Sequence, residues 1–194
     1  EILINGDYHW QTYTNYTQGN AKMRLERVAT DAWAQGIKAT VFNCPEIRTN
    51  SSDIFVGVEL SLFPLLRALK QEGGAAWAEA QWQACRDTLQ EGASLEALLQ
   101  KIDAYNATGV MQAYRNFAAW PMDNSAALAD LMIGTSDEIT QMHKDRKVLV
   151  TDILSVLVLE GTGPLMFGEA SHPAAPVLWL NHDVIAKQLN RIHG

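Results

Sequence analysis

A long helical stretch between two sets of short strand-like segments is the feature that most constrains how this chain can fold. From Phe63 to about Met142, apolar residues recur at helical spacing. The clearest helix follows Ser94, which we expect to be its N-cap. Its apolar stripe contains Leu95, Leu98, Leu99 and Ile102.

Strand-like segments flank this helical stretch on both sides. Before it, the apolar run ILING (2–6) and the alternating run IKATVFNC (37–44) enclose one helix. After it, LMF and VLWLN (177–181) would be strands, followed by a last amphipathic helix capped by Asn181 or Asp183. The helix between the first two strands would turn one apolar stripe towards the core, made of Leu25, Val28, Ala29, Ala32 and Trp33.

This order of elements, β-α-β, a helical block and β-β-α, resembles the thioredoxin fold. The helical block between the two halves resembles the DsbA-like branch of that fold, which implies a bacterial protein. The fold class implied is α/β, a thioredoxin-like mixed sheet with a helical insertion. Residues 1–62 and 148–194 would form the thioredoxin-like domain, and residues 63–147 the inserted helical subdomain.

One local string that carries the resemblance lies after the first strand. Members of the DsbA-like family follow this strand with Asp-Tyr or Asp-Phe, one further residue and a CxxC active site. Here Asp-Tyr-His (7–9) precedes WQTY (10–13). Trp10 and Tyr13 stand at the two cysteine positions, and neither side chain can attack a disulfide. The resemblance therefore implies a degenerate active site without dithiol redox activity.

A second string lies near the C-terminal strands. GTGPLMFGE (161–169) resembles the family's turn that ends in a cis-proline, which makes Pro164 the matching residue. Together the two strings predict a face that binds a partner protein or a small ligand. Its residues would be Tyr8, His9, Trp10, Tyr13 and Pro164.

Two other functions stay open. The resemblance also includes the glutathione-dependent 2-hydroxychromene-2-carboxylate isomerases. In such an enzyme the hydroxyl of Thr12 or Tyr13 would polarise the substrate or activate glutathione, while His9 would move a proton. The third possibility is a structural subunit of a larger assembly. Binding is favoured over catalysis, with no cofactor unless the isomerase interpretation holds and glutathione is used.

Composition excludes several classes of partner. The net charge of −7 and the pI near 5.2 argue against nucleic acid, because phosphate binding needs clustered Lys and Arg. The longest apolar run, 148–161, contains Asp152 and is too short to cross a membrane. Cys44 and Cys85 lack the spacing of a zinc site and are expected to be two buried thiols rather than one disulfide. We therefore expect a soluble, cytoplasmic or periplasmic protein without a metal, of open oligomeric state.

Overall fold

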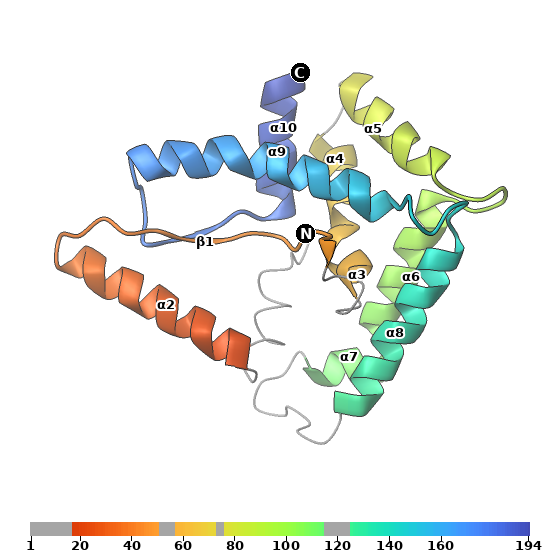
Figure 1. The fold of residues 1–194 in the computed structure, drawn as a ribbon, viewed down its shortest axis with the longest axis horizontal. Coiled ribbons are helices and arrows are strands. Elements are labelled where there is room, and N and C mark those ends of the chain that lie inside the picture. Colours follow the sequence, from red (N-terminus) through yellow and green to blue (C-terminus); the bar gives the residue numbers. More distant parts are fainter. Residues whose placement is uncertain (1–16, 51–56, 73–75, 115–124) are drawn as a thin grey trace.

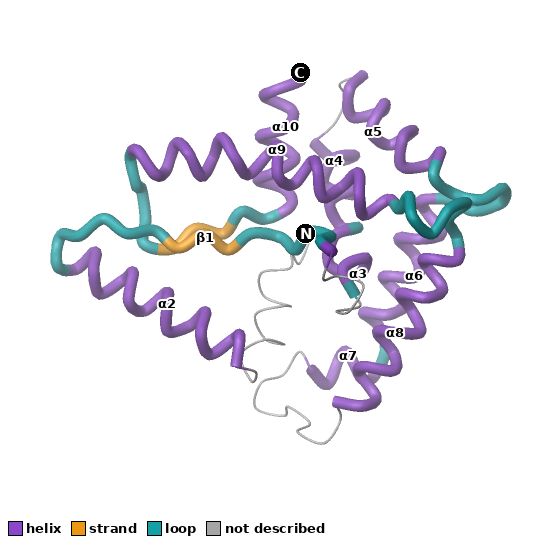
Figure 2. The backbone as a smooth tube through the Cα atoms, viewed as in Figure 1, coloured by secondary structure: helices purple, strands orange, loops and turns teal. Residues whose placement is uncertain are grey.

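The computed structural model describes residues 17–50, 57–72, 76–114 and 125–194. Most of these residues are helical, and two short strands lie among the helices (Figures 1 and 2). The helices are α2 (Thr17–Ala34), α3 (Val58–Leu62), α4 (Pro64–Glu72), α5 (Ala76–Asp87), α6 (Leu95–Ala107), α7 (Gly109–Tyr114), α8 (Ser125–Gln141), α9 (Val150–Ser171) and α10 (His182–His193). The strands are β1 (Val41–Asn43) and β2 (Val177–Trp179).

The two strands are parallel neighbours although they lie far apart in the sequence. Val41 is in register with Val177, and Asn43 with Trp179. Helix α2 contacts both strands and covers one side of the pair. The described part of the chain is therefore mainly helical with one parallel strand pair, and the expected thioredoxin-like mixed sheet is wrong.

The hydrophobic core lies where α4, α9 and α10 meet. Among its fully buried side chains are Leu65, Leu154 and Ile185. Helices α9 and α10 approach closely at Gly161, where a Cβ atom would lie 2.7 Å from the Cγ2 atom of Ile185. Helix α4 shares this core with α9 and α10. The proposed division into an α/β domain and an inserted helical subdomain stays a prediction.

The segment GTGPLMFGE, expected to form a turn and a strand, lies inside α9 instead. The described residues contain no cis peptide bond, so Pro164 does not open a cis-proline turn there. Proline lacks the N–H that would continue the helical hydrogen bonding. The helix nevertheless continues past Pro164 to Ser171, and Gly161 and Thr162 in the preceding turn are buried. The Thr162 hydroxyl donates to the carbonyl of Val158 at 2.7 Å.

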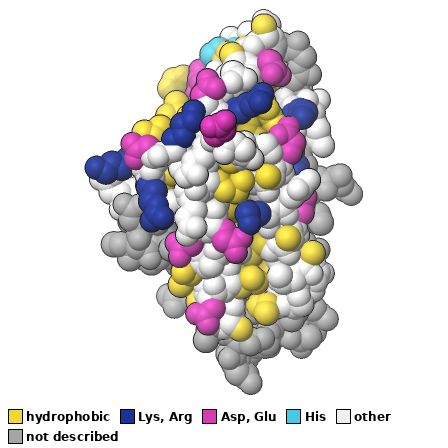
Figure 3. Space-filling model, turned by 90° about the vertical axis from the view of Figure 1, so that its right-hand side faces the viewer, with side chains coloured by type: hydrophobic (Ala, Val, Ile, Leu, Met, Phe, Trp, Pro, Cys, Tyr) yellow, Lys and Arg dark blue, Asp and Glu magenta, His cyan; other side chains and the backbone are white. Residues whose placement is uncertain are grey.

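Helix α6 follows the expectation from its sequence. The Ser94 hydroxyl accepts the backbone N–H of Ala97 at 3.1 Å, which confirms the N-cap. The apolar stripe of α6 is buried, and Lys101 forms an ion pair with Glu138 of α8 at 2.5 Å. Figure 3 shows the side of the molecule that carries α6 and α8, where acidic and basic side chains are intermixed around apolar patches. This face offers no separate basic patch of the kind that phosphate backbones require.

Helix α9 is long and apolar enough to cross a membrane, judged by length and composition alone. However, 44% of its apolar window is buried inside the molecule, and the helix contacts α3, α5 and α10. The helix is thus partly buried in the core, while Val156, Leu159 and Phe167 are exposed.

Candidate functional site at the carboxyl ends of the strands

The polar segment that follows β1 is the candidate site, and we call residues 44–49 the post-strand loop. Since β1 and β2 are parallel, their carboxyl ends meet at one edge. The backbone N–H of Leu180 donates to the carbonyl of Asn43 at 2.8 Å, which holds the two strand ends together. In open α/β folds, ligands bind outside the carboxyl ends of parallel strands.

Helix α2 fixes the last residue of β1. The side-chain amide of Asn43 donates to Glu26 Oε1 at 2.7 Å, and both side chains are partly buried. A hydrogen bond to a carboxylate is stronger than one between neutral groups. The bond therefore orients the Asn43 amide and ties the strand end to the middle of α2.

Helices α3 and α9 hold the rest of the post-strand loop. The Ser61 hydroxyl donates to Glu46 Oε2 at 2.9 Å. The backbone N–H of Arg48 donates to Ser155 Oγ at 2.8 Å, while its guanidinium pairs with Asp152 at 2.8 Å. Loop positions bonded to two helices are ordered before any ligand arrives, which lowers the entropic cost of binding.

The cysteine at the start of this loop is poorly suited to thiolate chemistry. Cys44 is a free thiol with an exposed side chain, yet partial desolvation raises its pKa above the ordinary value. Cys85, expected to be buried, is buried, and desolvation raises its pKa to about 12. Only the thiolate is a nucleophile, so both thiols are largely unreactive near neutral pH.

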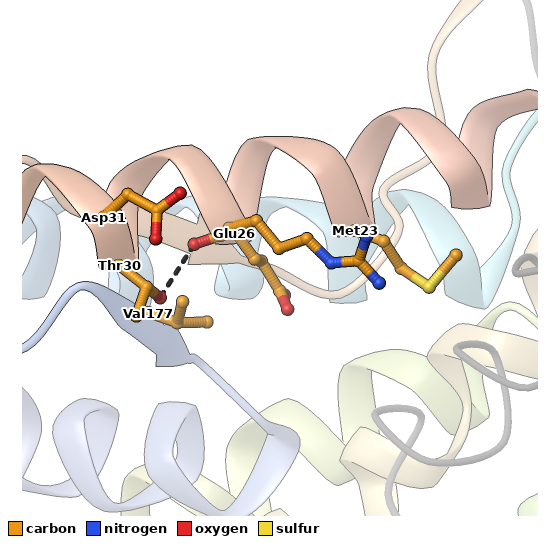
Figure 4. A pocket seen from close by; sticks show the side chains of 6 residues that line it. Met23, Glu26, Thr30, Asp31 and Val177 are labelled. Carbon is orange, nitrogen blue, oxygen red and sulfur yellow. Dashed lines mark hydrogen bonds between the residues drawn. The ribbon is translucent and has the colours of Figure 1, made fainter.

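A groove lies between α2 and β2. Its volume is about 260 Å³, and Figure 4 shows the side chains that line it. Glu26 connects the groove with the loop, because it lines the groove and also accepts the Asn43 amide. The groove is lined by Met23, Glu26, Arg27, Thr30, Asp31 and Val177.

The helix N-termini near this edge are poor sites for a phosphate. Two backbone N–H groups at the start of α9 already have acceptors within the protein. His143 Nε2 accepts the N–H of Val150, and Asp152 accepts the N–H of Leu149. The first turn of α10 contains Asp183, whose charge repels an anion. Within the described ranges, no group of three or more His, Cys, Asp or Glu side chains could hold a metal ion. The described residues around the loop therefore offer neither a cluster for a metal ion nor an open N-terminus of α9 for a phosphate.

Most of the binding and catalytic residues expected from the sequence fall outside the described residues. This applies to Tyr8, His9, Trp10, Thr12 and Tyr13, so their roles stay predictions. Pro164 is described, and it is an exposed residue within α9.

The sequence analysis missed the residues that build the post-strand loop. Polar residues directly after a strand were the available signal, and Asn43 and Glu46 follow a β-rich run. Nothing local indicates that they pair with α2 and α3. The residues missed were Glu26, Asn43, Glu46, Arg48 and Asp152.

The described residues thus form a mainly helical fold around one short parallel strand pair, and α2, α3 and α9 hold the strand end and the polar loop that follows it. The model of one family, enoyl-acyl carrier protein reductase FabMG, matches residues 1–189. The chain therefore belongs to the FabMG family. A comparison with curated proteins found no match.

Two solved structures agree with this assignment. The apo structure of FabMG, described as a novel type of enoyl-acyl carrier protein reductase, is 78% identical with a TM-score of 0.85 and covers 93% of this chain. The NADH-bound structure of FabMG is 71% identical with a TM-score of 0.74 and also covers 93%. The chain spans only 41% and 44% of these two solved chains.

These findings correct the expectations drawn from the thioredoxin resemblance. The family is FabMG and not the DsbA-like branch, so the degenerate redox site and its non-redox binding function are wrong. The isomerase and structural-subunit alternatives conflict with the same family assignment. The expectation of no cofactor, or of glutathione, is contradicted by a relative that binds NADH. The resemblance failed because the expected order of strands and helices is not present: LMF lies within α9, and the described residues contain only two short strands.

Proposed function

We propose that this chain is part of an enoyl-acyl carrier protein reductase that uses NADH. The match of the family model over residues 1–189 carries this proposal. The 78% identity over 93% of the chain supports it. NADH would supply the hydride that reduces the carbon–carbon double bond of the enoyl thioester.

We assign the post-strand loop to the part of the reductase active site that contacts the cofactor and the substrate. It lies at the carboxyl edge of the parallel strands, and the contacts of Asn43, Glu46 and Arg48 order it. A site held by packed elements keeps bound groups in the geometry that a hydride transfer needs. The role we propose for the loop is therefore to bind the cofactor and the substrate and to orient them for hydride transfer.

The fit to a dinucleotide is partial. Polar strand ends suit the hydroxyl and amide groups of such a ligand. A free helix N-terminus is a common site for its pyrophosphate, but His143 and Asp152 already accept the N–H groups at the start of α9, and Asp183 opposes an anion at α10. The described residues thus fit one side of the site, and the pyrophosphate would be held elsewhere in the reductase.

The test is made on the full polypeptide that contains this sequence. NADH oxidation is followed at its absorbance with an enoyl thioester as acceptor, and NADH binding is measured by calorimetry. We expect turnover with NADH, and we expect Asn43→Ala to raise the Kd for NADH about tenfold, which corresponds to roughly 1.4 kcal/mol. The matched control is Gln83→Ala, because Gln83 also donates its amide to a carboxylate, Asp87 at 2.7 Å, but on the exposed side of α5. Absence of both turnover and NADH binding at millimolar concentration would overturn the proposal.

A further inference from the structure

Helix α2 has an apolar stripe whose two large side chains are not covered by the described residues. Leu25 is 55% exposed and Val28 is 63% exposed, whereas Ala29 is only 4% exposed. The sequence predicted that these side chains share one buried face. Instead, α2 contacts both strands and buries Ala29, while Leu25 and Val28 are exposed. Helix α2 lies at the periphery of the molecule in Figure 1.

The uncovered stripe has a symmetric sequence. Ala21, Leu25, Val28 and Ala32 are spaced by four, three and four residues, so they fall on one side of the helix. The order is small, large, large, small, and it reads the same in both directions. In an antiparallel helix pair, Leu25 would pack against Val28 of the partner copy and Ala21 against Ala32 of the partner copy. Such a face is self-complementary, as a two-fold interface requires.

The charged residues beside the stripe have the same symmetry. Arg24 and Asp31 lie on one flank of the stripe, both are exposed, and the structure shows no ion pair for either within the described residues. They are seven positions apart, or about 10 Å along the helix axis. In an antiparallel pair with a two-fold axis, the same flanks adjoin, so Arg24 of each copy lies beside Asp31 of the other. Two ion pairs would form without any change in the fold.

We infer that α2 pairs with α2 of a second copy of this chain through the stripe Ala21, Leu25, Val28 and Ala32. The alanines at both ends allow the helices to approach closely, and the central Leu and Val fill the contact. This inference rests on the helix face and is independent of the proposed reductase activity.

Sedimentation velocity of the full polypeptide tests the inference. The wild type is expected to sediment as a dimer at micromolar concentration, and Leu25→Glu is expected to raise the dimer Kd at least 100-fold, because it places a charge in the contact. Ile133→Glu is the matched control, since Ile133 is 43% exposed on α8 and lies outside the stripe. This control is expected to leave the Kd unchanged.

Exchanging the two charges distinguishes pairing with a second copy of this chain from coverage of the stripe by any other segment or protein. Arg24→Asp and Asp31→Arg are each expected to weaken the dimer about tenfold, and the double variant is expected to restore it, because the ion pairs reform with reversed sign. A monomeric wild type, or a double variant as weak as the sum of the two single changes, would overturn the inference. A Leu25→Glu variant that lowers the Tm without changing the mass would show that another segment of the same chain covers the stripe, and would also overturn it.

Discussion

The imidazole Nε2 atom of His143 accepts the backbone N–H of Val150 at 3.2 Å, so a buried histidine caps the first turn of the longest helix. Its other ring nitrogen lies 3.0 Å from the carbonyl of Ile139. These two contacts require the neutral tautomer with the proton on Nδ1. His143 thereby joins the end of α8 to the start of α9, the helix that also anchors the post-strand loop through Asp152 and Ser155.

Stability should depend on the protonation of His143. Burial lowers the pKa of the His143 imidazole below its ordinary value of 6.5, and this effect outweighs the backbone carbonyls of Ile139 and Thr140 and the carboxylates of Glu59 and Asp152, which raise it. The unfolded chain therefore takes up the proton at a higher pH than the folded chain does. The contribution of His143 to the free energy of unfolding is complete above about pH 6.5 and is lost as pH falls through the folded pKa.

Urea denaturation at several pH values measures this effect. His143→Gln keeps an acceptor for the Val150 N–H without a titrating group, so its stability should fall less between about pH 7 and pH 5 than that of the wild type. Equal pH dependence in the two proteins would contradict the assignment.

Gly161→Ala should destabilise the protein by about 1–3 kcal/mol, because the new methyl group meets Ile185 in the tight contact of α9 with α10. Gly168→Ala in the same helix is the matched control, since a Cβ atom there meets nothing within 4 Å. That change should be neutral or stabilise the helix by up to about 1 kcal/mol. Chemical denaturation of both variants gives the comparison, and a similar loss in both would show that the close approach is not the cause.

Asp152→Ala should cost about 1–2 kcal/mol, because Asp152 accepts the Leu149 N–H at the start of α9 and also pairs with Arg48 of the post-strand loop. The control is Asp103→Ala, which breaks the more exposed pair with Arg67 and should cost at most about 0.5 kcal/mol. Thermal unfolding followed by circular dichroism measures both. Equal Tm values for the two variants would contradict the capping role of Asp152.

The two thiols should differ in their reaction with a disulfide reagent. Desolvation raises the pKa of both Cys44 and Cys85, the latter to about 12, but only Cys44 is exposed. We therefore expect Cys44 to react more slowly than a free thiol at about pH 7.5, and Cys85 to react only after unfolding. Thiol titration in the absence and presence of denaturant counts each group, and a Cys85 that reacts in the folded protein would be incompatible with its burial.

Several elements could be read from the sequence because their causes are local. The Ser94 cap and the buried stripe of α6 act within one or two helical turns. The same holds for α10, which begins after Asn181 and buries Ile185 and Leu189. The strand at β2 also lies where its apolar run predicts one.

The tertiary structure decided the rest, because the decisive contacts join residues far apart in the chain. Pro164 lies within α9 against its local signal, and the tight contact of that helix with α10 at Gly161 could not be read from the sequence. The position of α2 on the strands decided which edge of its apolar stripe became exposed. The post-strand loop depends on Arg48 reaching Asp152, more than one hundred positions away. Periodicity and capping act over a few residues, whereas such contacts form only when the helices are already packed. The sequence alone therefore determined helices such as α6 and α10, and the tertiary structure determined the course of α9 and the candidate site.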